Sequence, residues 1–237
     1  MSTLYIVASP IGHLEDITLR ALSILKSVDL ILCEDTRLTK RLLDHYEIRA
    51  RTLSYHAQSQ DSKTVQIVSL LKEGKNLALV SDAGTPGISD PGAELVGKIR
   101  FELAEEIKSG ILKIKAIPGP SALLAALSIA GVPCADFTFL GFLPHKKGRQ
   151  TLFAEIAASE RTMVFYESPH RIMKTLEALT DLRMSDIRMK KVTICRELTK
   201  IYEEVVQGSA AEVKKYFDDH PDKVRGEFVV IVSNIKG

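Results

Sequence analysis

The sequence predicts an α/β protein built from two α/β domains, the first with a mostly parallel sheet and the second with a mixed sheet. Short apolar runs typical of buried strands alternate with amphipathic segments through the first half of the chain. In the second half, five strand candidates are separated by only three helix candidates. Alternating strands and helices indicate right-handed βαβ units, whereas strands that follow each other directly indicate a hairpin.

The first half supplies its elements in regular order. Leucines recur at a spacing of three from Leu19 to Leu25 and predict an amphipathic helix, with Asp16 or Thr18 available as its N-cap. Gly74 is placed to close a later helix. The expected strands are 4–9, 28–35, 51–56, 75–82 and 111–117, and the expected helices are 15–28, 64–74 and 93–108, with a further helix entered at 33–41.

The segment Pro118-Gly119-Pro120-Ser121 breaks the strand pattern and marks the domain boundary. We therefore expect an N-terminal domain over 1–118 and a C-terminal domain over 119–237. A helix follows the boundary and runs to Gly131; further helices are expected behind Pro144, after Ser168-Pro169, and at 209–217, where Ser209 and Glu212 form a capping box. The strand candidates are 137–143, 161–168, 191–198, 202–209 and 227–234.

Composition sets the broad class of protein. The 237 residues are 45% hydrophobic and 26% charged, with a net charge of +2, which permits an RNA partner but does not require one. Cys33, Cys134 and Cys195 form no CxxC pair; two of them lie in apolar runs, and we expect buried reduced thiols there. No run is long enough for a membrane span and no basic leader precedes the first strand, so a cytoplasmic protein is expected.

Several common motifs are absent from the sequence. There is no GxGxxG after the first strand, no GxxxxGK[ST], no GxSxG and no HExxH. The sequence therefore argues against the usual dinucleotide site, the common Rossmann methyltransferase loop, a P-loop, a hydrolase nucleophile elbow and a zincin. No residue set suggests a metal site.

Chemistry is expected where strands of the parallel sheet end, because ligands of such sheets bind beyond the carboxyl ends of the strands. The stretch SDAGTPGISDPG (Ser81–Gly92) follows a strand and carries Asp82 and Asp90. Its carboxylates suit a cationic ligand or ribose hydroxyls and its backbone N–H groups suit an anion, although a turn without a ligand stays the alternative. In CEDTRLTKR, Asp35 and Arg37 belong either to a capped helix or to a site at the edge of the sheet.

Two segments of the second half also allow both a structural and a functional interpretation. In FYESPHR, Glu167 ends a buried strand and either pairs with Arg171 or Arg196 in a structural role or takes part in a site. The segment PHKKGRQ is either a solvated basic turn or a phosphate-binding loop, in which Lys146, Lys147 and Arg149 would give affinity without base specificity. All of these segments lie in loops that follow expected strands.

Eight stretches form a recognisable set when read in order: YIVASPIGHLEDITLRAL, CEDTRLTKRLL, ALVSDAGTPGISDPG, IPGPSALLAALSIAG, FLGFLPHKKGR, FYESPHR, CRELTKIYEE and GEFVVIV. Together they resemble the bacterial 16S rRNA cytidine 2′-O-methyltransferase (RsmI) family, within the tetrapyrrole methylase (class III) superfamily. The resemblance runs nearly from end to end. It departs from the family at His13, where asparagine is usual, and in the more charged and longer approach to the PGPS segment.

The resemblance implies S-adenosyl-L-methionine bound in a cleft between two α/β domains, a homodimer, and 16S rRNA, within the small ribosomal subunit, as partner. It also implies cofactor contacts at Pro10, Ile11, Asp82, Ala83, Gly84, Thr85, Pro86, Ser121, Ala122, Tyr166, Glu197 and Glu227, with Gly226 beside the last of these. The glycines and prolines of SDAGTPGISDPG would then form a wall against the methionine end of the cofactor.

The implied reaction is an in-line attack of a ribose 2′-oxygen on the sulfonium methyl, helped mainly by positioning. The catalytic candidates are Asp35, Arg37, Glu167 and Arg196, with Glu197 as a further candidate base. Two other hypotheses stay open. One is a small-molecule tetrapyrrole methylase of the same fold, against which the basic segments 37–41 and 145–149 speak. The other is a binding protein that kept the cofactor pocket without catalysis.

Overall fold

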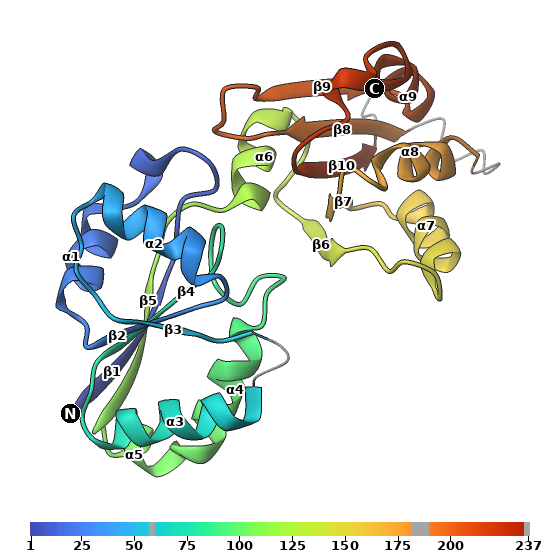
Figure 1. Ribbon diagram of the computed structural model, residues 1–237. Coiled ribbons are helices and arrows are strands. Elements are labelled where there is room, and N and C mark those ends of the chain that lie inside the picture. Colours follow the sequence, from blue (N-terminus) through green and yellow to red (C-terminus); the bar gives the residue numbers. More distant parts are fainter. Residues whose placement is uncertain (57–59, 182–189, 235–237) are drawn as a thin grey trace. The chain divides into compact units, whose positions relative to one another are not determined.

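The computed structural model describes residues 1–56, 60–181 and 190–234 (Figure 1). The chain forms two compact units, Met1–Ser121 and Ala122–Gly237, called unit 1 and unit 2 below. Unit 1 holds a parallel sheet and unit 2 a mixed sheet, as predicted. In the part of the chain that the structure describes, no helix is both long enough and apolar enough to cross a bilayer.

The sheet of unit 1 has five parallel strands in the order β3-β2-β4-β1-β5. Its central strand β4 is buried along its whole length, which explains the unbroken apolar run in the sequence. The strands are β1 (Ser2–Val7), β2 (Leu30–Cys33), β3 (Thr52–Ser54), β4 (Leu77–Val80) and β5 (Leu112–Ile117). Because all five run the same way, their carboxyl ends share one edge of the sheet. This edge is called the rim.

Helices cover both faces of this sheet (Figure 1). One face packs against α1 and α2, and the other against α3, α4 and α5. The helices are η1 (Leu14–Asp16), α1 (Leu19–Ser27), α2 (Thr36–His45), α3 (Gln60–Lys72), α4 (Gly92–Glu102) and α5 (Ala104–Lys108). Thr18 is the N-cap of α1, its hydroxyl accepting from the Ala21 N–H at 3.1 Å. The helix expected over 93–108 is divided at Leu103, whose side chain is buried among Leu95 and Ile99.

The sheet of unit 2 has the order β6-β7-β10-β8-β9. Strands β6 and β7 are parallel, and the other neighbours are antiparallel. The strands are β6 (Phe137–Phe142), β7 (Thr162–Glu167), β8 (Lys190–Arg196), β9 (Glu204–Gly208) and β10 (Phe228–Asn234). The predicted hairpin is confirmed, since β8 and β9 pair in antiparallel register from Arg196–Glu204 to Val192–Gly208.

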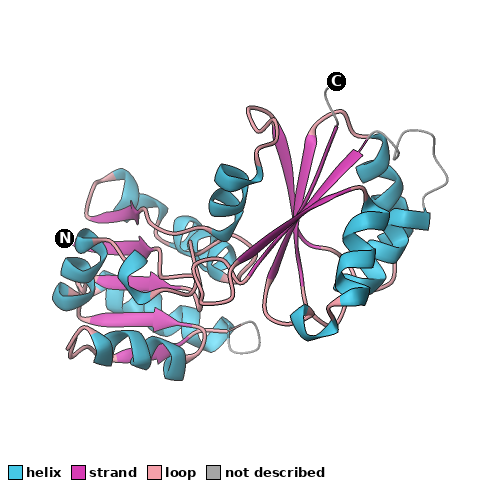
Figure 2. Cartoon of the chain, turned by 90° about the horizontal axis from the view of Figure 1, so that it is seen from above, coloured by secondary structure: helices cyan, strands magenta, loops and turns pink. Residues whose placement is uncertain are grey.

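The two faces of this second sheet are covered unequally. Alternate side chains such as Ile194 and Val230 pack with Phe153, Leu176 and Phe217 beneath three helices. The intervening side chains face α6, where the Cys195 Sγ lies 4.0 Å from the Ala126 carbonyl oxygen. Figure 2 shows the strands fanned out by the twist of the sheet, with helices on either side. The helices are α6 (Ala122–Ala130), α7 (Arg149–Ala158), α8 (Ile172–Asp181), α9 (Ala210–Asp219) and η4 (Pro221–Lys223).

The three cysteines lie in different environments, and thiol labelling can distinguish them. Cys33 and Cys195 are buried, as predicted, and Cys134 is exposed. Burial raises the pKa of the Cys33 thiol and raises the pKa of Cys195 to about 12, so both stay protonated and unreactive near pH 8. We expect one rapidly reacting thiol per native chain in a disulfide-exchange assay, abolished by Cys134→Ser, and three in denaturant. Two fast thiols in the native protein would contradict this assignment.

Candidate functional site

The loop after β4 is fastened to the segment after β1 at the rim of unit 1. Ser9 and Gly84 exchange backbone hydrogen bonds, the Ser9 N–H donating to Gly84 at 2.9 Å and the Gly84 N–H to Ser9 at 3.1 Å. The Ser9 hydroxyl also donates to the Ser81 carbonyl at 3.0 Å. Two segments that are far apart in the sequence therefore form one surface at the carboxyl ends of neighbouring strands.

Close backbone approach explains the glycines at the rim. Gly84 has φ +81°, and a Cβ there would lie 3.4 Å from the Ile11 Cγ2 atom. A Cβ at Gly119 would stand only 3.0 Å from the Ala8 Cβ atom. The Thr85 hydroxyl donates to the Pro120 carbonyl at 3.1 Å. The segments after β1, β4 and β5 thus pack closely against one another, and the predicted contact residues Pro10 and Ile11 are buried there.

The two acids of the Ser81–Gly92 loop have different roles. Asp90 accepts the Gly87 N–H with both carboxylate oxygens at 2.9 Å and the Gly92 N–H at 2.6 Å, so its carboxylate shapes the loop and the start of α4. Asp82 is exposed and its Oδ1 accepts the Asp35 N–H at 3.0 Å. Of the two carboxylates, Asp82 is the one left available to a ligand.

Asp35 and Arg37 form an ion pair at the start of α2. The Arg37 Nη2 atom lies 2.7 Å from the Asp35 Oδ2 atom, and Asp35 also caps the helix by accepting the Arg37 N–H at 2.8 Å. The hydrogen bond from the Arg37 side chain lowers the pKa of Asp35 to about 2, so this carboxylate is ionised at neutral pH. The Arg37 side chain is 89% exposed and lines an open pocket of about 440 Å³ together with Lys40 and Arg49.

The rim carries a negative field. Glu34 stands next to Asp35, and burial together with the charges of Asp82 and Asp90 raises the pKa of Glu34. Four carboxylates thus gather at the carboxyl ends of β2 and β4. Arg37 balances the charge of Asp35, and the remaining carboxylates favour a ligand that carries positive charge.

In unit 2, Glu167 is the centre of a buried cluster at the end of β7. Its side chain is fully buried, and its Oε1 atom lies 2.7 Å from the Arg171 Nε atom while its Oε2 atom lies 3.3 Å from the Arg149 Nη2 atom. The Thr175 hydroxyl and the Ser168 N–H also donate to the carboxylate, at 2.7 and 2.9 Å. Glu167 therefore pairs with Arg171, one of the two structural partners suggested by the sequence, and with Arg149 instead of Arg196.

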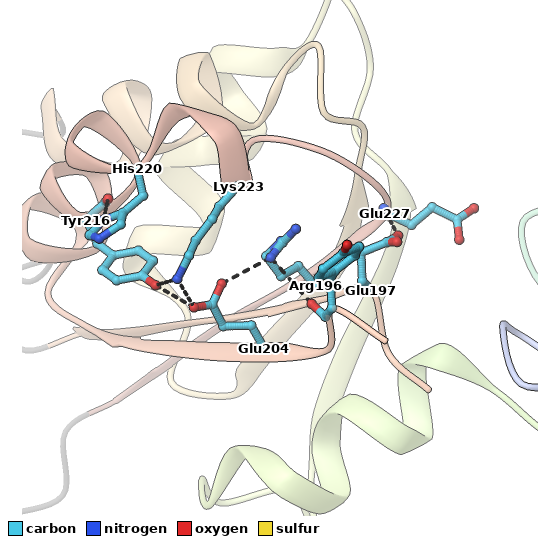
Figure 3. Close-up of polar contacts among 8 residues, drawn as sticks. Arg196, Glu197, Glu204, Tyr216, His220, Lys223 and Glu227 are labelled. Atoms are coloured by element: carbon cyan, nitrogen blue, oxygen red, sulfur yellow. Dashed lines mark hydrogen bonds and ion pairs between the residues drawn. The ribbon is translucent and has the colours of Figure 1, made fainter. Parts of the chain in front are cut away.

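Arg196 belongs to a second network, drawn in Figure 3. Its Nη1 atom lies 3.2 Å from the Glu204 Oε2 atom, and the Lys223 Nζ atom lies 2.6 Å from the other oxygen of Glu204. The Tyr216 hydroxyl donates to Glu204 as well. Burial raises the pKa of Glu204, but the hydrogen bonds from Lys223, Tyr216 and Arg196 outweigh it, and the net pKa is lowered. The buried Arg196 Nε atom has no hydrogen-bond partner among the described residues.

Glu197 lies beside this network and is held in a strained conformation. Its backbone has φ +51°, uncommon for a residue with a side chain. Its Oε1 atom accepts the Glu227 N–H at 3.1 Å and lies 2.9 Å from the Lys200 Nζ atom, which also lies 3.1 Å from a Glu227 oxygen. A Cβ at Gly226 would overlap the Glu197 carboxylate. The predicted contact residues Glu197 and Glu227 are therefore brought together (Figure 3).

The remaining predicted contact residues are placed as follows. Tyr166 is half-buried at the end of β7, with its ring 5.0 Å from Phe139 and 5.4 Å from Phe142, and burial raises its pKa. Ser121 is the last residue of unit 1, and Ala122 begins α6. Sequence reasoning missed Glu204, Tyr216 and Lys223. No local pattern marks them, because they join through side chains of separate elements; Glu204 and Lys223 are 19 positions apart.

Comparison with known proteins shows which family the chain is similar to. Residues 3–214 match the family of Tetrapyrrole (Corrin/Porphyrin) Methylases. The Ribosomal RNA small subunit methyltransferase I of Thermotoga maritima is 42% identical over 98% of this chain and 99% of its own length. That of Halalkalibacterium halodurans is 44% identical over 97% of this chain and 75% of its own length.

Solved structures agree in fold. The uroporphyrin-III C-methyltransferase of Thermus thermophilus, solved in complex with S-adenosylhomocysteine, superposes with a TM-score of 0.64. The match covers 98% of each chain at 19% identity, which supports a shared fold alone. The match to the family model over most of the chain, together with the relatives at 42–44% identity, shows that this chain belongs to the tetrapyrrole methylase family.

Proposed function

We propose that the protein is an S-adenosylmethionine-dependent methyltransferase that methylates the ribose 2′-oxygen of a cytidine in 16S rRNA. The observation that carries the proposal is the 42–44% identity, over nearly the whole chain, to proteins named Ribosomal RNA small subunit methyltransferase I. A homodimer that works in the cytoplasm on the small ribosomal subunit is part of the same proposal.

The rim of unit 1 suits this cofactor. S-adenosylmethionine, when bound, supplies a methyl group on a positively charged sulfur, and its methionine end adds an ammonium group. The carboxylates of Glu34 and Asp82 give that end of the sheet the opposite charge, whereas the charge of Asp35 is balanced by Arg37. Gly84, with φ +81°, lets the loop after β4 pack directly against Ile11 of the segment after β1. Asp82–Pro86, Pro10 and Ile11 are the proposed cofactor contacts in unit 1, followed by Ser121.

Residues of unit 2 complete the proposed contact set. Tyr166 offers a half-buried ring, and Glu197 is fixed beside Glu227 by Lys200. Carboxylates held in this way accept hydrogen bonds from ribose hydroxyls or amino groups. Ala122, at the start of α6, is the remaining proposed contact.

Asp35 and Arg37 are the residues that we assign to the RNA. A carboxylate with a pKa near 2 is a weak base, so Asp35 is better suited to accept a hydrogen bond from the 2′-hydroxyl and orient it than to remove its proton early. Arg37 is exposed, always protonated and able to bind a phosphate oxygen or stabilise the developing charge on the 2′-oxygen. Positioning then supplies most of the acceleration, because a thioether is a good leaving group.

Glu167 and Arg196 are positioning residues in this proposal. The Glu167 carboxylate is saturated by two guanidinium groups, a hydroxyl and a backbone N–H, which leaves it no free site for a substrate proton. Arg196 is held by Glu204 at the end of β8, directly before Glu197. Each fixes the backbone next to a proposed contact residue, Tyr166 in one case and Glu197 in the other.

The test is methyl transfer from isotopically labelled S-adenosylmethionine to small ribosomal subunits, or to free rRNA, from cells that lack this protein. We expect one ribose methylation per subunit, on a cytidine, mapped by its resistance to alkaline cleavage. Asp82→Asn should weaken cofactor binding, whereas Asp218→Asn, which removes the same charge from an exposed carboxylate of α9, should not. A protein that labels neither substrate would refute the proposal, and a labelled tetrapyrrole would favour the small-molecule methylase.

A further inference from the structure

The loop between β6 and α7 displays cations that the fold itself does not use. His145, Lys146 and Lys147 are exposed. Within residues 1–56, 60–181 and 190–234, neither lysine makes an ion pair. By contrast, Lys200, Lys214 and Lys223 of unit 2 each pair with a carboxylate. Residues 144–148 are called the basic loop below.

The basic loop is anchored at its base by the Glu167 cluster. The Arg149 Nη1 atom donates to the Pro144 carbonyl at 3.1 Å, and the Arg171 Nη1 atom donates to the Leu143 carbonyl at 2.9 Å. Both guanidinium groups bind Glu167 with their other nitrogens. One buried carboxylate therefore holds the two arginines that bind Pro144, the first residue of the loop, and Leu143 just before it, so the lysines project from a fixed base.

The charges of this region sum to a positive potential. Glu167 offsets one of its two arginines, and Lys146 and Lys147 add two further charges. A surface pocket of about 390 Å³ adjoins the loop, lined by Lys146, Gly148, Arg149, Gln150, Thr151, Phe153 and Ala178. No carboxylate is among these lining residues. The Arg149 guanidinium lies over the Phe153 ring, 5.0 Å from its centroid, which holds that charge at the pocket wall.

We infer that the basic loop binds the phosphodiester backbone of the substrate RNA, with Lys146 and Lys147 as its phosphate contacts. The inference rests on the proposed function, because it requires an RNA substrate. Lysines without an ion-pair partner, held on a fixed base, can bind phosphates. Phosphates carry the same charge at every nucleotide, so binding them requires no recognition of the bases. Arg149 has a different role from its two neighbours, since it anchors the loop and its side chain is only 15% exposed.

The experiment compares the full-length protein with its Lys146→Gln/Lys147→Gln variant, using 16S rRNA transcript as the probe. Removing one phosphate-binding lysine should reduce the slope of log affinity against log salt concentration by about 1. We therefore expect the double variant to bind the transcript about tenfold more weakly at low salt, with a slope reduced by about 2. Its affinity for S-adenosylmethionine and its thermal unfolding should match the wild type.

The matched control is Lys26→Gln/Lys108→Gln, which removes the same charge. These exposed lysines lie near the C-terminal ends of α1 and α5, at the end of the unit 1 sheet opposite the rim. The control should keep both affinity and slope. If the wild type methylates rRNA but the Lys146→Gln/Lys147→Gln variant keeps the wild-type salt slope, the inference is overturned and the proposed function stands. A wild type that neither binds nor methylates rRNA would overturn the proposed function, and the inference with it.

Discussion

Replacing Glu167 by glutamine is expected to lower the free energy of unfolding by about 3–5 kcal/mol, the usual cost of removing one partner from a buried ion pair. The substitution keeps the shape of the side chain and leaves Arg149 and Arg171 without a counter-charge, although both are only 15–16% exposed. The measurement is urea-induced unfolding followed by far-ultraviolet circular dichroism. The slope of the transition should stay that of the wild type.

Asp136→Asn provides the matched control for that prediction. It removes the same charge from a carboxylate of the same unit, but the ion pair of Asp136 with Arg161 is more than 60% exposed on both sides. Exposed pairs contribute only about 0–1 kcal/mol, so this variant should unfold almost as the wild type does. Equal unfolding midpoints for the two variants would show that the Glu167 cluster does not stabilise the unit.

Gly226→Ala should displace the Glu197 carboxylate and weaken the binding of S-adenosylmethionine at least tenfold. Gly226 has φ +79°, and an added Cβ would overlap the end of the Glu197 side chain. The left-handed backbone costs an alanine about 1–2 kcal/mol, and the overlap adds about 1–3 kcal/mol typical of overpacking. Calorimetric titration with the cofactor and urea unfolding measure the two effects separately.

Gly131→Ala separates backbone strain from overlap. Gly131 lies in the same unit with φ +59°, and nothing stands within 4 Å of where its Cβ would be. It should lose stability through the backbone alone and keep its cofactor affinity. In the double variant Gly226→Ala/Glu197→Ala the overlap is gone, so stability should partly return while affinity does not. If Gly226→Ala retains wild-type affinity, Glu197 is not a cofactor contact.

Local pattern in the sequence predicted most of the fold, because strand and helix periods are local properties. The apolar run before Ser81 is a central strand, Thr18 is a cap, and the second half does contain a hairpin. The break at Leu103 was not predictable in this way. Leu95, Ile99 and Leu103 keep the four-residue spacing of one unbroken amphipathic helix, so the pattern of buried residues gives no sign of the break.

The candidate site was less predictable, since side-chain partners depend on distance in space. Asp82 and Asp90 look equivalent in the sequence, yet only Asp90 is engaged by the N–H groups of its own loop. Glu167 could be assigned to a strand end, but its second arginine comes from 18 positions earlier. Gly226 resembles an ordinary turn glycine until the folded chain brings Glu197 against it.

The carboxylate of Asp90 has a consequence for affinity. A loop rich in glycine would ordinarily sample many backbone states and would lose that freedom when a ligand arrives. Here, the bonds from Gly87 and Gly92 to Asp90 restrict the loop in advance. The loop is therefore pre-organised, and little of the intrinsic binding energy is consumed in ordering it.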